Sequence, residues 1–415
     1  MVNLRNIAAI VTVLLGCGLA APAPAVPAAG AGSVIPGSYI ITLKPDVDAT
    51  KAKTHIKWVT DIHKRSLTKH DTAFGVERTY DCQSGFQGYA GTFGDTTIEA
   101  IRKSSEVLAI EPNRVWKLSR VNSKRDIEKR DEITQKKSTW GLGTISHRKK
   151  GYQEYIYDNN AGNGTYAYVI DGGVRVTHNE FQNRAKAVWT HWKGDNEDTE
   201  GHGTHVAGTI AGKIYGVAKK ANILALKVFQ GEQSETSIIL DAFNWAVNDI
   251  VKKDRTRRAV INMSLGGDKS AALNKAVDNA SKKGVVAVVA SGNDGMDAAK
   301  QSPASAASAI TVGAIDSDWA VADFSNWGKA VDMLAPGVGI TSAGYESNTD
   351  VLVMDGTSMA APHVAGLVLY AMSVKRIDGV ADVTQWLKDL ATPKKISGNL
   401  RGSPNLVANN GNNVQ

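Results

Sequence analysis

Beyond residue 140, short runs of apolar residues alternate with segments whose apolar residues recur at helical spacing. The runs are continuous rather than alternating, which is typical of strands buried on both faces of a sheet. The clearest helical segment extends from about residue 236 to 252. We therefore predict an α/β fold with a mainly parallel sheet and helices on both faces. The expected strands are Tyr166–Ile170, Ile223–Val228, Ala259–Met263, Val285–Ala290 and Ala309–Val312.

Residues 38–110 show a different pattern, with shorter strands and only two helical segments. The order of the elements is β-α-β-β-α-β, which predicts a small α+β open-faced sandwich. The expected elements are a strand at Ser38–Leu43, a helix at about 49–67, strands around Cys82 and Tyr89, a helix at about 96–104 and a strand at Val107–Ile110.

The first residues have the pattern of a secretory signal. Arg5 precedes the short apolar stretch Ile7–Leu19, and the small residues Ala20–Ala25 offer cleavage sites. The apolar stretch is short for a membrane span, so we predict a signal peptide over residues 1–20 and a secreted, extracellular protein. Leu14–Cys17 leaves a bacterial lipoprotein site as an alternative, against which the following Ala/Pro run argues.

Charge and cysteine content narrow the function classes. The net charge is +7, but most of the excess lies before residue 131, and no basic stripe interleaved with aromatic residues is present. We therefore expect no nucleic-acid partner. The chain has two cysteines, Cys17 and Cys82. Because none follows residue 130, the larger part must be stable outside the cell without disulfides.

Three polar residues stand in motifs that together hold the groups of a nucleophilic site. Asp171 follows an expected strand, at the carboxyl end where open α/β sheets place their sites. His202 lies in GHGTHVAGT, and Ser358 lies in GTSMAAPHVAG at an expected helix start. Alone, Asp171 would be interpreted as a turn aspartate and Ser358 as a helix cap. The order acid, histidine, serine instead predicts a catalytic triad, with Ser358 as nucleophile and His202 as base.

Asn293 and His205 are two further candidates. Asn293 follows another strand end in ASGNDG, and its amide could donate to the oxyanion of a tetrahedral intermediate; a turn asparagine is the alternative. His205 lies three residues after His202 and suggests a metal site. The His-Glu-x-x-His pattern and an obvious third ligand are both missing, so we interpret His205 as structural. A metal-dependent hydrolase is kept as a third-ranked alternative.

These motifs resemble those of the subtilisin-like serine proteases, closest to the secreted fungal alkaline-protease and proteinase K branch. HGTHVAGT, SLGG, SPAS, FSNWG, APGV and GTSMAAPHVAG stand in the family order within residues 38–400. The resemblance implies a triad of Asp171, His202 and Ser358, with Asn293 in the oxyanion hole. It also implies a secreted serine endopeptidase of broad specificity that favours large apolar side chains before the cut.

The first third resembles the inhibitory propeptide of these enzymes, which assists folding and then occupies the cleft. Aligning TQKKSTWGLG with the family start places maturation near residues 131–133, just after the dibasic pair Lys129-Arg130. The charged segment around this pair is expected to be both a solvated linker and a processing site. We therefore expect a signal peptide at 1–20, a propeptide at 21–130 and a peptidase domain at 131–415. The implied partners are protein or peptide substrates and the propeptide; no membrane partner is expected, and the enzyme is expected to be a monomer.

The resemblance also implies binding residues. Catalysis needs no cofactor, but a structural calcium is implied at Asp332, with carbonyl ligands from Ala307 and Ala309; a surface aspartate is the equal alternative. The strand Ser264, Leu265, Gly266 would pair with substrate backbone, and Ala290, Ser291, Gly292 would form the opposite wall of the pocket for the side chain before the cut.

The chain departs from the family pattern at three places. Gly172 stands where the family has Ser or Thr, so a hydroxyl that could hydrogen-bond the Asp171 carboxylate is missing. Ala361 replaces the usual Thr or Ser, and the loop Gln230–Glu235 is shorter and more acidic, which bears on the outer subsites. Gly172 supports the alternative of a catalytically weakened relative that binds peptides, whereas the intact triad opposes it.

Sequons for N-glycosylation occur at Asn163, Asn279 and Asn262. Asn262 lies within the expected core strand Ala259–Met263, which makes it the weakest candidate of the three.

Overall fold

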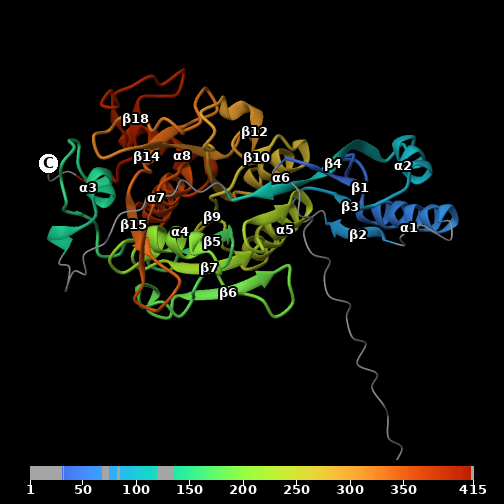
Figure 1. Cartoon of the computed structure of the whole chain (residues 1–415), viewed down its shortest axis with the longest axis horizontal. Helices are drawn as coiled ribbons and strands as arrows, with labels where there is room; N and C mark the ends of the chain where they lie inside the picture. The colour runs from blue at the N-terminus through green and yellow to red at the C-terminus, as the bar shows by residue number, and fades with distance from the viewer. Residues whose placement is uncertain (1–29, 31, 68–73, 82–84, 119–134, 413–415) are drawn as a thin grey trace, which may run out of the picture.

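The computed structural model describes residues 30, 32–67, 74–81, 85–118 and 135–412, which form two units lying side by side (Figure 1). We call residues 30–118 the small unit and residues 135–412 the large unit. The expected signal peptide, both cysteines, the dibasic pairs and the expected boundary at residue 130 lie outside the described residues.

The small unit has the predicted β-α-β-β-α-β order, and its own strands form an antiparallel sheet in the order β2-β3-β1-β4. Asp48 caps the first helix, because its carboxylate accepts hydrogen bonds from the N–H groups of Thr50 and Lys51. Two predicted bounds were wrong, since the second strand ends before Cys82 and the last continues well beyond Ile110. The elements are β1 (Val34–Leu43), α1 (Ala49–Ser66), β2 (Gly75–Tyr80), β3 (Gly88–Thr92), α2 (Asp95–Arg102) and β4 (Val107–Lys117).

The large unit is built on a nine-stranded sheet in the order β17-β18-β14-β13-β11-β9-β5-β7-β6, and only β17 runs antiparallel to its neighbour. The five predicted strands are confirmed, with small changes at their ends, while β6, β14, β17 and β18 were not predicted. The strands are β5 (Tyr166–Asp171), β6 (Ala185–Thr190), β7 (Asn222–Lys227), β9 (Ala259–Met263), β11 (Val286–Ala290), β13 (Ile310–Ile315), β14 (Met333–Pro336), β17 (Thr392–Pro393) and β18 (Leu406–Val407).

Helices cover both faces of this sheet, as predicted. Alternate residues of β5 show why: Ala167 and Val169 pack with α4 and α7 on one face, and Tyr168 and Ile170 pack with α5 and α6 on the other. The helices are α3 (Trp140–Ser146), α4 (His202–Ala211), α5 (Thr236–Lys252), α6 (Ala271–Ser281), α7 (Thr357–Tyr370) and α8 (Val380–Leu390), with short helical turns at Gln135–Lys137, Asn179–Phe181, Ala298–Lys300 and Ala371–Lys375.

The remaining strands of the large unit are short and lie outside the main sheet. They are β8 (Gln233–Glu235), β10 (Gly267–Asp268), β12 (Gln301–Ser302), β15 (Ile340–Ala343) and β16 (Val351–Met354). β8 pairs with β4, so the sheet of the small unit gains a fifth strand from the large unit. Figure 1 shows β4 reaching from the small unit toward the centre of the large one.

By length and composition, one helical stretch among the described residues could cross a membrane, Thr357–Lys375. Within its apolar window, 89% of the residues are buried in the fold.

Candidate active site

Asp171 is the last residue of β5 and is fully buried. β5 lies between β7 and β9, and the chain builds the sheet outward from it in both directions. Such a switch point at the carboxyl ends of parallel strands is where α/β sheets place their sites. The Asp171 carbonyl accepts a hydrogen bond from Val228 N–H at 2.8 Å, which fixes the backbone at this end.

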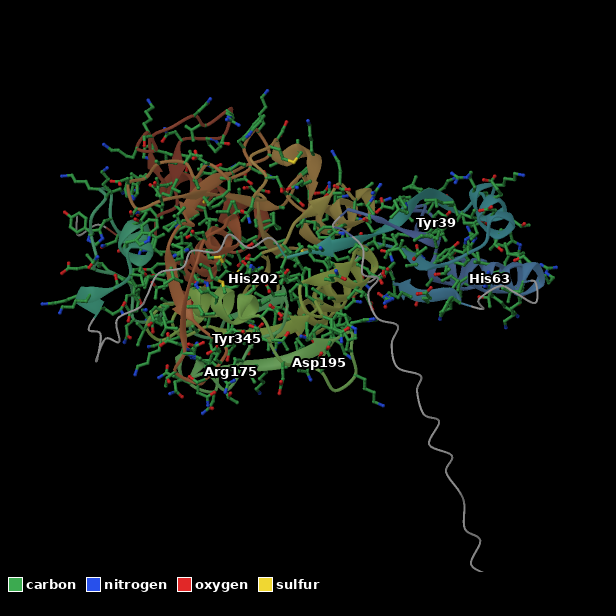
Figure 2. The ribbon with its side chains drawn as sticks, in the orientation of Figure 1. Tyr39, His63, Arg175, Asp195, His202 and Tyr345 are labelled. Carbon is green, nitrogen blue, oxygen red and sulfur yellow. The ribbon has the colours of Figure 1, made fainter. Side chains whose placement is uncertain are left out.

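His202 begins α4 and lies inside the large unit (Figure 2). Its Nδ1 is 2.8 Å from Asp171 Oδ1 and 3.0 Å from Oδ2, and the ring is 1% exposed. Within the part of the chain that the structure describes, Nε2 of this ring has no hydrogen-bond partner. A carboxylate on Nδ1 fixes the tautomer in which Nε2 carries the lone pair, the arrangement required of a general base.

The start of α4 is held by Asp198, a residue that sequence analysis did not single out. Its Oδ1 accepts from Gly201 N–H at 2.8 Å, and its Oδ2 accepts from Thr204 N–H and Oγ1 at 2.8 and 2.6 Å. A carboxylate at a helix N-terminus satisfies amides that have no helical partner. Asp198 therefore fixes the turn on which His202 stands.

The Asp171 carboxylate has a hydrogen-bond donor although residue 172 is a glycine. The Gly172 N–H itself donates to Asp171 Oδ1 at 2.7 Å. A β-carbon placed on Gly172 would lie 3.8 Å from both Leu118 and Asp198, so a side chain would have room there. Ala361, the second departure, is a residue of α7 and is buried in the core.

Ser358 is the second residue of α7, a helix whose residues are all buried. Its hydroxyl donates to the carbonyl of Ser264 at 3.1 Å, and the hydroxyl of Ser264 donates back to the Ser358 carbonyl at 2.8 Å. The hydroxyl is thus turned toward Ser264 rather than bonded to His202, and α4 and α7 pack against each other. Catalytic hydrogen bonds are often unformed in the absence of substrate.

Asn293 is oriented by Thr357. Its Oδ1 accepts from both the N–H and the hydroxyl of Thr357 at 2.8 Å, which turns the amide nitrogen the other way. A β-carbon built on Gly356 would lie 3.4 Å from Asn293 Nδ2 and 3.6 Å from Ser358 N. Asn293 Nδ2 and the Ser358 N therefore lie near one point at the start of α7, a placement that supports an oxyanion hole there.

A pocket opens beside Ser358. Four of the six predicted binding residues line it, whereas Ser264 and Ser291 are buried and do not. Gly292 has a φ of +105°, and a β-carbon there would lie 2.2 Å from Asn326 and Gln301, so only glycine fits. The lining residues are Leu265, Gly266, Ala290, Gly292, Asn293, Asp294, Gln301, Thr357 and Ser358.

The end of the small unit runs toward this site. β4 pairs antiparallel with β8, and Leu118 N–H donates to Glu232 O at 3.0 Å, which brings Leu118 within reach of Gly172. Trp116 is 1% exposed, and its indole N–H donates to Thr236 Oγ1 at 2.8 Å. A β-carbon on Gly267 would lie 2.9 Å from this ring. The loop that sequence analysis marked for outer subsites thus binds the small unit as an added strand.

His205 does not share a site with His202. Its Nε2 is 2.8 Å from the carbonyl of Ile340, and burial lowers its pKa to about 3, so the ring is neutral. Residues 30–118 and 135–412, apart from their undescribed gaps, contain no group of three or more His, Cys, Asp or Glu side chains that could hold a metal ion. This geometry supports the structural interpretation of His205 over the metal-dependent alternative.

Asp332 does not fit the expected calcium. Its Oδ1 lies 2.8 Å from Lys388 Nζ, and its Oδ2 accepts from Thr311 N–H at 2.9 Å. Calcium in proteins takes six to eight oxygen ligands, whereas here an ammonium group from α8 already neutralises the carboxylate.

The three sequons differ in accessibility. Asn163 is exposed in a turn, and Asn262 is fully buried with its amide on Ser264 Oγ at 3.0 Å. The amide of Asn279 donates to Gly85 O of the small unit at 2.5 Å. N-glycosylation attaches the glycan to the side-chain amide nitrogen of asparagine. The exposure of Asn163 therefore favours glycosylation there, and the burial of Asn262 opposes it.

Comparison with known proteins decides the family. Residues 162–410 match the Subtilase family, and residues 38–119 match Peptidase inhibitor I9. The chain belongs to the subtilase family. It is 50% identical over 387 residues to alkaline protease 1 of Aspergillus flavus, covering 92% of this subtilase and 93% of the relative. An alkaline proteinase of Hapsidospora chrysogena is 48% identical over 413 residues, covering 99% and 100% of the two chains.

A solved structure shows the same fold. The crystal structure of a cold-adapted subtilisin-like serine proteinase covers 65% of this subtilase and 97% of that chain, with a TM-score of 0.59 and 38% identity. This subtilase is therefore a serine endopeptidase made as a zymogen, and its small unit belongs to an inhibitor family. The comparisons give no support to a weakened peptide-binding relative.

Sequence analysis missed the supporting residues of the site. Thr357 lies within GTSMAAPHVAG and Asp198 lies just before GHGTHVAGT, but neither their positions nor their types mark them as residues that orient Asn293 and His202. The short distances from Asp171 to α4 and from Asn293 to α7 arise only on folding.

Proposed function

We propose that Ser358 attacks the carbonyl carbon of a peptide bond while His202 Nε2 accepts the hydroxyl proton. The Asp171 carboxylate orients the ring and stabilises its protonated form. The observation that carries this proposal is the Asp171–His202 Nδ1 bond at 2.8 Å, which leaves Nε2 as the available base. For the attack, the Ser358 hydroxyl must turn from the Ser264 carbonyl to this nitrogen.

The charge that develops on the substrate oxygen is stabilised by two donors. Asn293 Nδ2 and the Ser358 N lie near one another beside Gly356, and Thr357 holds Asn293 Oδ1, which leaves Nδ2 facing the other way. Donors fixed in advance stabilise the transition state because they need no reorganisation during the reaction. His202 then returns its proton to the leaving amine, and water completes hydrolysis of the acyl-enzyme by the same steps.

The pocket beside Ser358 is the proposed site for the side chain before the cut. Leu265 and Ala290 line it together with the polar residues Asn293, Asp294 and Gln301. The proposed preference for large apolar side chains within a broad specificity rests on the family resemblance. Ser264 and Gly266 are proposed to pair with substrate backbone. Every group that the reaction uses belongs to this chain, so the mechanism needs no cofactor.

The cellular context is part of the same proposal. We expect removal of residues 1–20 on secretion and cleavage near residue 130, followed by release of the small unit from a monomeric enzyme. The docking of β4 on β8 supports this order, because it brings the end of the small unit, at Leu118, within reach of Gly172. The fungal alkaline proteases it resembles favour an extracellular location.

Labelling with a fluorophosphonate tests the mechanism. We expect the processed wild-type protein to be modified at Ser358, and Ser358→Ala to remain unlabelled. Loss of the triad serine costs about 10⁶-fold in kcat in subtilisin, a member of this family, and we expect a loss of that order. Correctly processed protein without modification at Ser358 would refute the proposal, and inhibition by a zinc chelator alone would favour a metal hydrolase.

A further inference from the structure

Lys227 is a buried cation directly behind the proposed triad. It ends β7, and in the parallel register its Cα is the partner of Asp171. Its side chain is 2% exposed. The amino group donates to Gly172 O at 3.0 Å and to Glu197 O at 2.7 Å, and it lies 3.8 Å from Asp195 Oδ1. Figure 2 shows Asp195 nearer the edge of the unit than His202.

The two carbonyls belong to the two loops that carry the acid and the base. Gly172 follows Asp171 directly, and Glu197 precedes Asp198, the residue that fixes the start of α4 and hence His202. One ammonium group therefore joins the backbone behind Asp171 to the backbone leading to His202.

The same two loops touch without side chains between them. A β-carbon on Gly203 would lie 2.0 Å from Gly173 O, and one on Gly173 would lie 2.9 Å from Glu197 O. Contacts of this kind bring the loops together but do not lock their relative position along the contact. Two hydrogen bonds from one ammonium group fix the relative position of the loops, because each bond depends on both distance and angle.

A buried ammonium group contributes little to the free energy of unfolding. Its removal from water costs several kcal/mol, and well-packed apolar residues often replace buried charges without loss. An apolar side chain of the same length, however, could not donate to the two carbonyls. The cost is explained if the distance between the loops matters for the reaction.

We propose that Lys227 is a positioning residue, which sets the Asp171–His202 distance by bridging Gly172 O and Glu197 O. This inference rests on the triad proposed above. Lys227 acts through the two loops and does not touch substrate. Misplacement of a catalytic group by about 1 Å can cost about 10²-fold in rate, so loss of the bridge lowers kcat rather than substrate binding.

The test compares Lys227→Met with Lys227→Arg and a matched control. Methionine keeps the length and apolar stem but cannot donate, whereas arginine retains the charge and the donors. The control is Lys219→Met: Lys219 is 8% exposed, its ammonium donates to Ile214 O at 2.9 Å, and it lies over Tyr155 and Tyr157. Rates on a short peptide are divided by the concentration of sites titrated with a fluorophosphonate.

For Lys227→Met we expect kcat to fall about 10–100-fold with KM changed by less than about threefold. The low-field proton signal of His202 Nδ1–H, recorded in a Ser358→Ala background, should shift upfield or broaden. Lys227→Arg should recover most of the wild-type kcat and of the His202 Nδ1–H signal. Lys219→Met should leave kcat and this signal unchanged.

Three outcomes would overturn the proposal. These are a wild-type kcat per titrated site in Lys227→Met, an unchanged His202 signal, or a Lys227→Met chain that fails to fold even as the Ser358→Ala zymogen while Lys219→Met folds. Failure of the wild type to react with fluorophosphonate would instead refute the triad itself, so the two proposals fail separately.

Discussion

The large unit buries both faces of its sheet with its own helices, whereas the small unit buries only one. α1 and α2 cover one face of the small sheet and enclose a core of its own. The other face, which includes Ile40 and Tyr80, packs on α5 and α6 of the large unit. Even the edge of the small sheet is completed by a borrowed strand, β8.

This difference shows how a propeptide can depend on its enzyme for part of its core, while the enzyme does not depend on the propeptide for its own. Small domains bury a lower fraction of their surface and are marginally stable alone. The small unit therefore relies on apolar contacts with the large unit. The large unit keeps its two covering layers after the partner leaves. Removal of the small unit therefore costs the enzyme its cover, while the inhibitor loses part of its own core.

The largest expected effect is at Trp116, the largest fully buried side chain through which the small unit contacts the large one. Trp116→Ala removes the indole between Gly267 and Thr236 and should weaken the small unit as an inhibitor by about 30–1000-fold, or about 2–4 kcal/mol. The measurement is inhibition of the mature enzyme by residues 30–118 added in trans. Trp58→Ala, at a ring 36% exposed on α1, is the matched control. Equal losses in both variants would mean that the small unit does not depend on this contact.

Acid should loosen the docked state. His191 of the large unit lies 3.3 Å from Arg78 of the small unit, and its pKa is lowered to about 4, first by burial and then by the Arg78 charge. Because the docked state disfavours the proton, its stability is full above about pH 6.5, the ordinary pKa of histidine, and is lost as the pH falls toward 4.

Binding of residues 30–118 to the Ser358→Ala enzyme, followed by fluorescence anisotropy from pH 8 to 5, tests this expectation. Arg78→Met removes the charge repulsion, which is the smaller of the two causes, and should reduce the pH dependence in part. A pH dependence that is unchanged in Arg78→Met would show that the cross-unit contact plays no part in it.

A smaller effect is expected at Lys388. Its replacement tests whether the Lys388 ammonium group, rather than a calcium ion, is the positive charge that stabilises Asp332. Lys388→Met should lower the melting temperature by about 1–3 °C, because partly exposed ion pairs contribute about 0.2–1 kcal/mol. Thermal unfolding of the wild type in calcium and in chelator gives the comparison. A chelator-induced loss of stability that disappears in Asp332→Asn would restore the expected calcium site.

The smallest effect is expected at Gly172, where the catalytic site meets the end of the small unit. Since the Gly172 N–H already donates to Asp171, Gly172→Ser should change kcat/KM by less than about threefold, or below about 0.7 kcal/mol. Peptide hydrolysis by the matured variant measures this. A gain of tenfold or more would show that the missing hydroxyl limits the enzyme.

Elements with strong local signals were predictable. The helix α5 was predicted with its observed bounds, because seventeen residues of regular apolar spacing leave little ambiguity. β6 and β14 were missed: β6 is partly exposed and contains Lys186, and β14 ends in a proline, so neither shows the continuous apolar run of a buried strand. β4 was predicted too short, since beyond Ile110 it continues to pair with β1 as far as Arg114 and pairs with β8 from Val115 to Lys117.

For the candidate site, order and motif type in the sequence indicated Asp171, His202, Ser358 and Asn293. Their chemical groups are local properties of the chain, and short motifs preserve them. The amide on Asp171 Oδ1 that replaces the expected hydroxyl and the Lys388 ammonium on Asp332 were not predictable, because each partner is identified only by a distance.

The sequence by itself determined the α/β class, the inhibitor-like first third and the family of the enzyme. These features were predictable because buried strands, helical spacing and catalytic motifs are patterns among residues that are close together in the sequence. Only the tertiary structure decided that Lys227 donates to both Gly172 O and Glu197 O, and that the small sheet takes its fifth strand from the large unit. These contacts join residues that lie far apart in the chain, and their energies depend on distances that no local pattern contains.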